Sequence, residues 1–406
     1  SMRCPANSIQ SPSSLPSSSS ISISRPPSCR QPPLRISVKV YCSHSADQSP
    51  DETESLISIL RSIPNWSDAV KERGMRKVRP LYNHDKWMEH RSSLRHVRHM
   101  LSSLSSRVVL SLIPPVIFFT SFAVIVASYN SAVLMGWLPE CFPILRSSSL
   151  PYQLTAPALA LLLVFRTEAS YSRLQEGRKA WTKVISGTTD FAQHIIASVQ
   201  CPRDAPLKKA LLQYALAFPI ALKCHVLHGS DIRRDLQGLL EADDLAIVLS
   251  SKHRPFCITG FISQSIQLLN LEESKKNALD SRISCFHEGI AVCDELIGIP
   301  IPLSYTRLTS RFLVFWHLTL PVILWDDCHW IVVPATFISA ASLFCIEEVG
   351  VLIEEPFAML PLVELCNKVH EDVWEIIVAK KSIEALLNVK RKGCTTQHST
   401  NGPIHR

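Results

Sequence analysis

The chain has 406 residues, a formal net charge of +7 and hydrophobic side chains at 46% of its positions. A soluble core would spread its apolar residues along the chain, but here they gather in uncharged blocks, which argues against a protein built only of ordinary soluble domains. No basic cluster carries interleaved aromatic side chains, so the positive charge is no sign of nucleic-acid binding.

Residues 1–45 have the composition of a targeting segment. They are rich in Ser and Pro, contain Arg3, Arg25, Arg30 and Arg35, and have no acidic residue before Asp47. A secretory signal would need a continuous apolar core of about 7–15 residues, and none is present. The segment predicts a chloroplast transit peptide cut near residues 40–45, with a disordered tail kept on the mature protein as the alternative. Residues 46–85 are predicted to form a stromal linker and helix.

Four stretches without a formal charge are each roughly long enough to cross about 30 Å of hydrocarbon. They are predicted to span a membrane at about residues 108–129, 147–165, 312–325 and 328–346. Basic residues just before the first stretch resist translocation, so both termini are expected on the stromal side. The predicted fold class is an all-α membrane protein with four transmembrane helices.

The segments outside these stretches are of two kinds. Residues 166–311 mix charges with apolar residues at helical spacing, which predicts a large helical stromal region continuous with the membrane helices. Residues 376–406 end in a polar sequence and are predicted to be a C-terminal tail, largely disordered.

The cysteines and histidines give no metal pattern. The 13 cysteines include no C-x-x-C pair, which favours free, reduced thiols over a disulfide framework or a zinc site. The pairs His96/His99 and His225/His228 lie three residues apart on predicted helices, but neither has a third ligand nearby in the sequence. We predict neither a metal ion nor a cofactor. The sequence also lacks a P-loop, a dinucleotide fingerprint and a nucleophile elbow, so an enzyme is not expected.

A proline interrupts the second predicted span. Pro157 has no N–H for the carbonyl of Gln153, which leaves a polar group at membrane depth. Such a group is tolerated inside protein or against water, so this span is predicted to avoid lipid. Pro157, Leu161 and Phe165 follow one another at i, i+4 and i+8 and therefore share one helix face.

Three further elements carry a resemblance to a known family. The segment FRTEASYSRLQEGRKAW begins at Phe165, IGIPIPLSYTR ends at Arg307, and IEEPF begins at Ile353 and is followed by Leu360 and Pro361. In order, spacing and position relative to the four predicted spans, these elements resemble the bestrophin family across about residues 80–375. Residues 86–375 are accordingly predicted to form a bestrophin-like channel domain.

The resemblance implies a homopentamer around one central anion pore. The second span would line the axis, and Pro157, Leu161 and Phe165 would form the constriction called the neck. An ordinary apolar stripe packed against a neighbouring helix is the alternative for these three residues. A second, stromal constriction would fall within residues 266–283.

The resemblance also suggests roles for charged residues. Arg146, near the lumenal mouth, is expected to attract anions weakly. Arg166 is expected to hold the helix through an ion pair with Glu168, Glu176 or a partner subunit. The residues expected to take part in structural ion pairing are Arg166, Glu168, Arg173, Glu176 and Arg178.

One departure from animal bestrophins concerns calcium. Their calcium site uses a run of aspartates after the third element, where this chain has Leu360 and Val363. These side chains offer no oxygen to a cation that requires several oxygen ligands. Calcium gating is therefore not expected.

The expected function is passive conduction of chloride, and of nitrate as a second ion, across the thylakoid membrane. Such a conductance would adjust the membrane potential and so the partition of the proton motive force. The expected partners are small anions, the lipid bilayer and further copies of the chain. Two alternatives are a proton-coupled anion or bicarbonate transporter, although no internal repeat is visible, and a membrane scaffold without transport. An envelope location is the alternative to the thylakoid.

Overall fold

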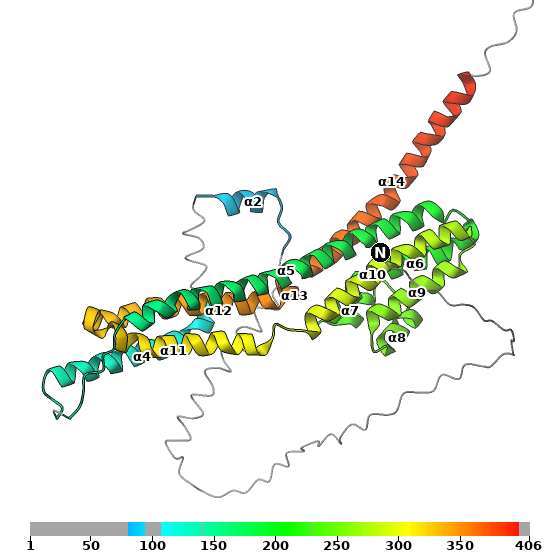
Figure 1. Ribbon diagram of the computed structural model, residues 1–406. Helices are drawn as coiled ribbons and strands as arrows, with labels where there is room; N and C mark the ends of the chain where they lie inside the picture. Colours follow the sequence, from blue (N-terminus) through cyan, green and yellow to red (C-terminus); the bar gives the residue numbers. More distant parts are fainter. Residues whose placement is uncertain (1–79, 94–106, 140, 228, 398–406) are drawn as a thin grey trace, which may run out of the picture. The chain divides into compact units, whose positions relative to one another are not determined.

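The computed structural model describes residues 80–93, 107–139, 141–227 and 229–397. All of them belong to one compact unit. The predicted transit peptide, residues 46–79 of the predicted linker and helix, and the pair His96/His99 lie outside the described residues. The described ranges contain helices and no strand, as the sequence predicts (Figure 1).

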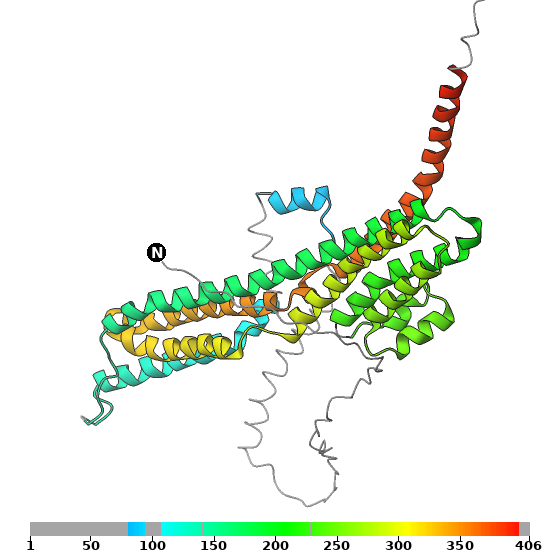
Figure 2. The same cartoon turned by 45° about the vertical axis from the view of Figure 1, so that its right-hand side comes forward.

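The four predicted span segments lie in four helices that contact one another. They are α4 (Arg107–Leu134), the first part of α5 (Leu150–Ser198), α11 (Leu303–Cys328) and α12 (Val332–Glu354). Helix α12 packs against α4, α5 and α11, and α11 also contacts α4 and α5 (Figures 1 and 2). Apolar side chains such as Leu159, Leu163 and Leu313 fill the space between these helices.

Two stretches of the described chain are long and apolar enough to cross a membrane, Ser111–Leu134 and Leu303–Glu354. The second stretch is divided by His329, whose φ of 45° turns the chain between α11 and α12. In the apolar 18-residue segment of each stretch, only 33% and 22% of the residues are buried. The core helix of a soluble protein would be mostly buried, whereas these helices leave large apolar side chains uncovered. The apolar start of α5 is not one of these two stretches.

The helix that contains the second predicted span, α5, continues beyond residue 165 to Ser198 as one helix (Figures 1 and 2). Pro151 lies in its first turn, where a missing N–H costs nothing. Beyond Phe165 the helix keeps a buried face that includes Ser170, Trp181 and Val184. One helix therefore joins the predicted membrane part to the predicted stromal part.

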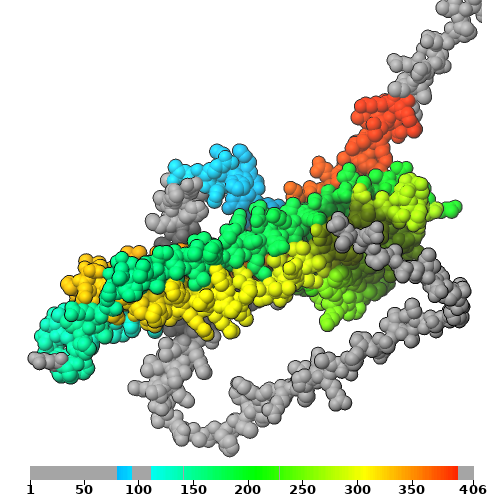
Figure 3. All heavy atoms as spheres, viewed as in Figure 1, coloured from blue at the N-terminus to red at the C-terminus, as the bar shows by residue number. Residues whose placement is uncertain are grey.

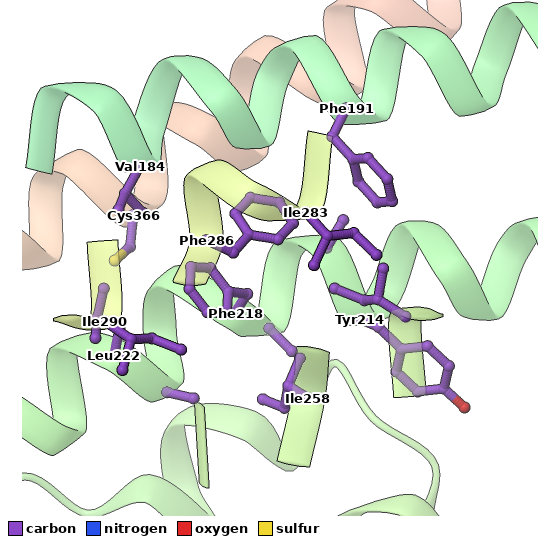
Figure 4. Close-up of a cluster of buried hydrophobic side chains, with 14 of the residues drawn as sticks. Val184, Phe191, Tyr214, Phe218, Leu222, Ile258, Ile283, Phe286, Ile290 and Cys366 are labelled. Atoms are coloured by element: carbon purple, nitrogen blue, oxygen red, sulfur yellow. The ribbon is translucent and has the colours of Figure 1, made fainter. Parts of the chain in front are cut away.

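The far half of α5 packs on a second group of helices: α6 (Ala205–Val226), α7 (Ile232–Leu236), α8 (Ala242–Ser250), α9 (Arg254–Leu268) and α10 (Glu273–Gly298). Their shared core is built around Phe191, Phe218 and Phe286 (Figure 4). The ring of Phe286 lies 5.5 Å from that of Phe191 and 4.5 Å from that of Phe218, measured between centroids. The predicted helical region at 166–311 is thus observed. The short elements α2 (His84–Arg91), η1 (Pro202–Asp204), η2 (His329–Ile331) and α13 (Pro356–Met359) complete the described part before the last helix.

The tail predicted to be largely disordered from residue 376 is helical up to residue 397, so for residues 376–397 the prediction is wrong. Helix α14 runs from Leu362 to Gln397, and residues 398–406 lie outside the described ones. The segment is polar, but its described residues after 376 include no proline and one glycine, Gly393. Lys380 forms an i,i+4 ion pair with Glu384 at 3.4 Å and donates a hydrogen bond to the carbonyl of Ile196 on α5. A polar composition is compatible with a helix when such pairs and contacts support it.

The nine cysteines with described side chains are all free, as expected from the sequence. Burial raises the pKa of the Cys224, Cys293 and Cys366 thiols to about 12. These groups therefore stay protonated at neutral pH and are poor nucleophiles and metal ligands.

Helices α5 and α10 approach so closely that glycine is required on both sides. A Cβ atom added at Gly187 would collide with the sulfur of Cys285, and one added at Gly289 would collide with the Cγ2 atom of Val184. Val184 is fully buried and β-branched, so it has little freedom to move aside.

We expect Gly289→Ala to lower the free energy of unfolding by about 1–3 kcal/mol through overpacking. Gly260→Ala, on α9, is the matched control, because nothing lies within 4 Å of its added Cβ atom, and it should gain up to about 1 kcal/mol from helix propensity. Thermal unfolding of the two detergent-solubilised variants measures the difference. Equal melting temperatures would contradict the close approach.

Candidate ion pathway along α5

The candidate neck residues lie on a face of α5 that the chain itself leaves uncovered. Leu161 and Phe165 are 53% and 56% exposed, and Pro157 is also exposed. Figure 3 shows α5 at the molecular surface in this view. The opposite face is closed, since Leu159 and Leu163 are buried against α11 and α12. Helical periodicity therefore separates a packing face from a free apolar face, which we call the α5 stripe: Leu154, Pro157, Leu161 and Phe165.

Arg166 follows this stripe in sequence but points to the buried side of α5. Its side chain is 1% exposed, and its Nη2 atom lies 3.8 Å from Oε2 of Glu354 at the end of α12. The other oxygen of Glu354 accepts a hydrogen bond from the N–H of Ile301 at 3.3 Å. The partner of Arg166 is thus neither Glu168 nor Glu176, the two candidates within the chain that sequence reasoning named.

Arg173, two turns further along α5, binds carbonyl groups at the ends of two other helices. Its guanidinium donates to the carbonyls of Leu296 at 2.5 Å and Ile299 at 2.7 Å, which end α10, and to that of Glu354 at 3.3 Å, which ends α12. The last carbonyls of a helix lack partners within it and carry partial negative charge. Arg173 therefore stabilises the C-termini of α10 and α12 at once.

The three sequence elements that carry the family resemblance meet at this place. Arg173, in the first element, binds the carbonyls of Ile299 in the second and Glu354 in the third. A Cβ atom added at Gly177 would lie only 2.9 Å from Cβ of Pro356, so a glycine is needed where α5 crosses the third element. The hydroxyl of Tyr305, in the second element, donates to the carbonyl of Leu162 on α5 at 3.2 Å. We call the contacts of Arg166 and Arg173 with Leu296, Ile299 and Glu354 the arginine junction.

Other predicted charged residues are not brought together. Glu168, Glu176 and Arg178 are exposed on α5 and form no ion pair with another described residue. The prediction of structural ion pairing is therefore not met for these three within one chain. Sequence reasoning found the arginines but not their partners, because helix-end carbonyls and Glu354 lie far away along the chain.

Arg146 is exposed on the loop that joins α4 to α5. The loop is held by Asn130, a fully buried side chain near the end of α4 that no sequence pattern singled out. Its amide donates to the carbonyl of Leu145 at 2.9 Å and accepts from the N–H of Leu145 at 2.8 Å. The hydroxyl of Tyr129 also donates to the carbonyl of Pro143. Arg146 therefore projects from a fixed backbone.

The third element does not collect oxygen ligands for calcium among the described residues. Leu360 packs against the core that α5 shares with the second group of helices, and Glu354 is engaged at the arginine junction. Within the described ranges one group, His225, His253 and Asp294, could hold a metal ion. His228, the partner that the sequence offered for His225, lies outside the described residues.

Comparisons with known proteins agree with this arrangement. Residues 86–375 match the family model described as bacterial/fungal bestrophin protein. Voltage-dependent chloride channel 1, chloroplastic, from Arabidopsis thaliana is 67% identical over 351 residues, which cover 86% of each chain. Voltage-dependent chloride channel 2, chloroplastic, from the same plant is 60% identical over 372 residues, which cover 91% of each chain.

A solved structure shares the fold. The crystal structure of a bacterial bestrophin homologue from Klebsiella pneumoniae has a TM-score of 0.58 at 21% identity, covering 65% of this chain and 98% of that one. With the family match over most of the chain and relatives of this identity, the conclusion is direct: the chain belongs to the bestrophin family.

Proposed function

We propose that this bestrophin is a passive anion channel of the thylakoid membrane that conducts chloride, and also nitrate, through a neck lined by the α5 stripe. The observation that carries the proposal is the uncovered apolar stripe of Pro157, Leu161 and Phe165. This stripe lies on a helix that the arginine junction anchors. Two relatives of the chain are named as chloroplastic voltage-dependent chloride channels.

A single α5 encloses no pathway, so the proposal requires several copies of the chain. Five copies around one axis, as the family resemblance implies, would cover the α5 stripe and leave α4, α11 and α12 between neighbours and lipid. Large apolar side chains on α4 support contact with lipid or with another copy, since Ile117, Phe118 and Ile125 are each about 60% exposed. Both termini lie in the stroma in this proposal.

An apolar neck suits anion conduction because it holds no fixed site that would trap the ion, and small changes of radius can switch its wetting. Charge selection must then come from outside the neck. Arg146, held by the clamp of Asn130 on the α4–α5 loop, supplies positive charge at the lumenal mouth in this arrangement. Arg166 does not face the stripe, so its role in this proposal is structural.

The described side chains favour a channel over a proton-coupled transporter. A carrier of protons needs a titratable group in its pathway, whereas the α5 stripe carries none. The buried His317 lies away from the stripe, between α11 and α12. Its Nδ1 atom is bonded to the carbonyl of Leu313 at 2.8 Å and its Nε2 atom to Ser339 at 3.3 Å. Both nitrogens of His317 are thus engaged within the helix bundle, away from the α5 stripe.

In a thylakoid, passive anion flow would dissipate the electrical potential and leave the proton gradient in place. The partition of the proton motive force would then depend on how far the channel opens.

Planar-bilayer recording of the purified chain in excess calcium chelator tests the function. We expect unitary currents whose reversal potential follows the chloride gradient, because the third element offers Leu360 and Val363 in place of calcium ligands. Cation-selective currents, macroscopic flux without unitary steps, or currents that vanish without calcium would contradict the proposal.

Phe165→Ala tests the neck. The side chain is 56% exposed within one chain, so its loss should leave the fold intact while widening the pore and enlarging the anion current, with unchanged anion selectivity. Leu163→Ala is the matched control: Leu163 is buried on the opposite face of α5, and its loss should cost about 2–5 kcal/mol and impair assembly. Intact Phe165→Ala assemblies with the parent's conductance would exclude a neck at this residue.

Arg173→Lys tests the anchoring role of the arginine junction. A lysine cannot hold three separate carbonyls as the guanidinium fork does, so we expect a loss of about 1.5–3 kcal/mol for each charge-assisted hydrogen bond removed. Arg178→Lys, an exposed arginine one turn further on, should change stability by less than about 0.5 kcal/mol. Thermal unfolding of both variants makes the comparison, and equal stability would show that the carbonyl contacts contribute nothing.

A further inference from the structure

Three side chains from distant parts of the sequence meet in the second group of helices. His225 lies in the last turn of α6, His253 immediately precedes α9, and Asp294 lies on α10. Nε2 of His225 is 2.8 Å from Oδ1 of Asp294, and Nε2 of His253 is 3.2 Å from Oδ2 of the same carboxylate. The three potential ligand atoms all lie within 4.8 Å of one another.

This geometry is close to that of a metal site. Three ligands of a tetrahedral zinc ion, with bonds of about 2.1 Å, are about 3.4 Å apart from one another. The two nitrogen–oxygen separations, 2.8 and 3.2 Å, are shorter than that value, and no pair of ligand atoms is more than 4.8 Å apart, so shifts of about 1 Å would suffice. The side chains of His225, His253 and Asp294 are 29%, 32% and 40% exposed, which leaves room for water as a further ligand.

We propose that His225, His253 and Asp294 bind a divalent transition-metal ion of the zinc class and so join α6, α9 and α10. Two imidazole nitrogens and one carboxylate oxygen are the donors such ions prefer, whereas calcium and magnesium require oxygen ligands. The neighbouring Cys293 is fully buried in the core of this group of helices and lies outside the cluster.

The surroundings predict a reversible site rather than a permanent structural one. A metal-bound imidazole ordinarily donates its second N–H to a partner. The Nδ1 atom of His253 is buried and has no hydrogen-bond partner among the described residues, so affinity should be below that of a closed structural zinc site. Binding also displaces any proton from each ligating nitrogen, which makes it sensitive to pH.

The position of the site gives binding a structural consequence. Asp294 lies two residues before Leu296, whose carbonyl is held by Arg173. The metal site and the arginine junction therefore act on the same end of α10, although they do not share a side chain. The inference concerns binding alone and stands apart from the proposed ion conduction.

The test is equilibrium binding of Zn²⁺ to the full chain, purified without a polyhistidine tag and freed of metal by chelation. We expect saturable binding of one ion per chain. His253→Gln and Asp294→Asn should each weaken it by at least about tenfold. His287→Gln is the matched control, since His287 is exposed on the same helix as Asp294 and lies outside the cluster. Absence of saturable binding, or equal affinity in all variants, overturns the proposal.

A second measurement needs no variant and so does not depend on their folding. Co²⁺ bound to the unmodified chain should show only the ligand-field bands of nitrogen and oxygen coordination. A thiolate-to-metal charge-transfer band would place the ion on cysteines and would overturn the assignment.

Discussion

The contacts of Arg173 hold the structure in the form that any function of α5 requires. One guanidinium binds the terminal carbonyls of α10 and α12, so the helix that carries the neck candidates is tied to one helix from each of the two groups it joins. Carbonyls at helix ends must be satisfied, and a fixed, always charged fork can satisfy several at once. The free face of α5 can remain apolar because its anchoring is done elsewhere.

The separation between the anchoring contacts of α5 and its free apolar face explains where the charges lie. Arg166 and Glu354 face each other on the inner side of the junction, while the α5 stripe carries no ionisable group. A charge turned toward the neck would attract ions but would also hold them. The fold thus separates the groups that fix the helix from the surface proposed to meet the ion, and it leaves the positive charge of Arg146 at the other end of the first part of α5.

Helical periodicity predicted the exposed stripe, because spacing of i, i+4 and i+8 determines which residues share a face. It could not predict the partners of Arg166 and Arg173, since Glu354 and the end of α10 come near α5 only through tertiary packing. The unbroken course of α5 into its charged second half agrees with the expected helical region that continues from the membrane helices, although no sequence signal marked its end at Ser198. The helical course of α14 was missed because polar residues suggested disorder, and the metal candidates were missed because His253 and Asp294 lie far from His225 in sequence.

The position of Phe165 in the assembled protein tests the account most directly. A structure of the lipid-embedded assembly, determined by electron cryomicroscopy, should show five copies with the side chains of Pro157, Leu161 and Phe165 around a single axis and Arg173 still bound to the ends of α10 and α12. An assembly in which Phe165 faces lipid or packs inside a neighbouring chain, with no continuous path along the α5 stripe, would contradict it.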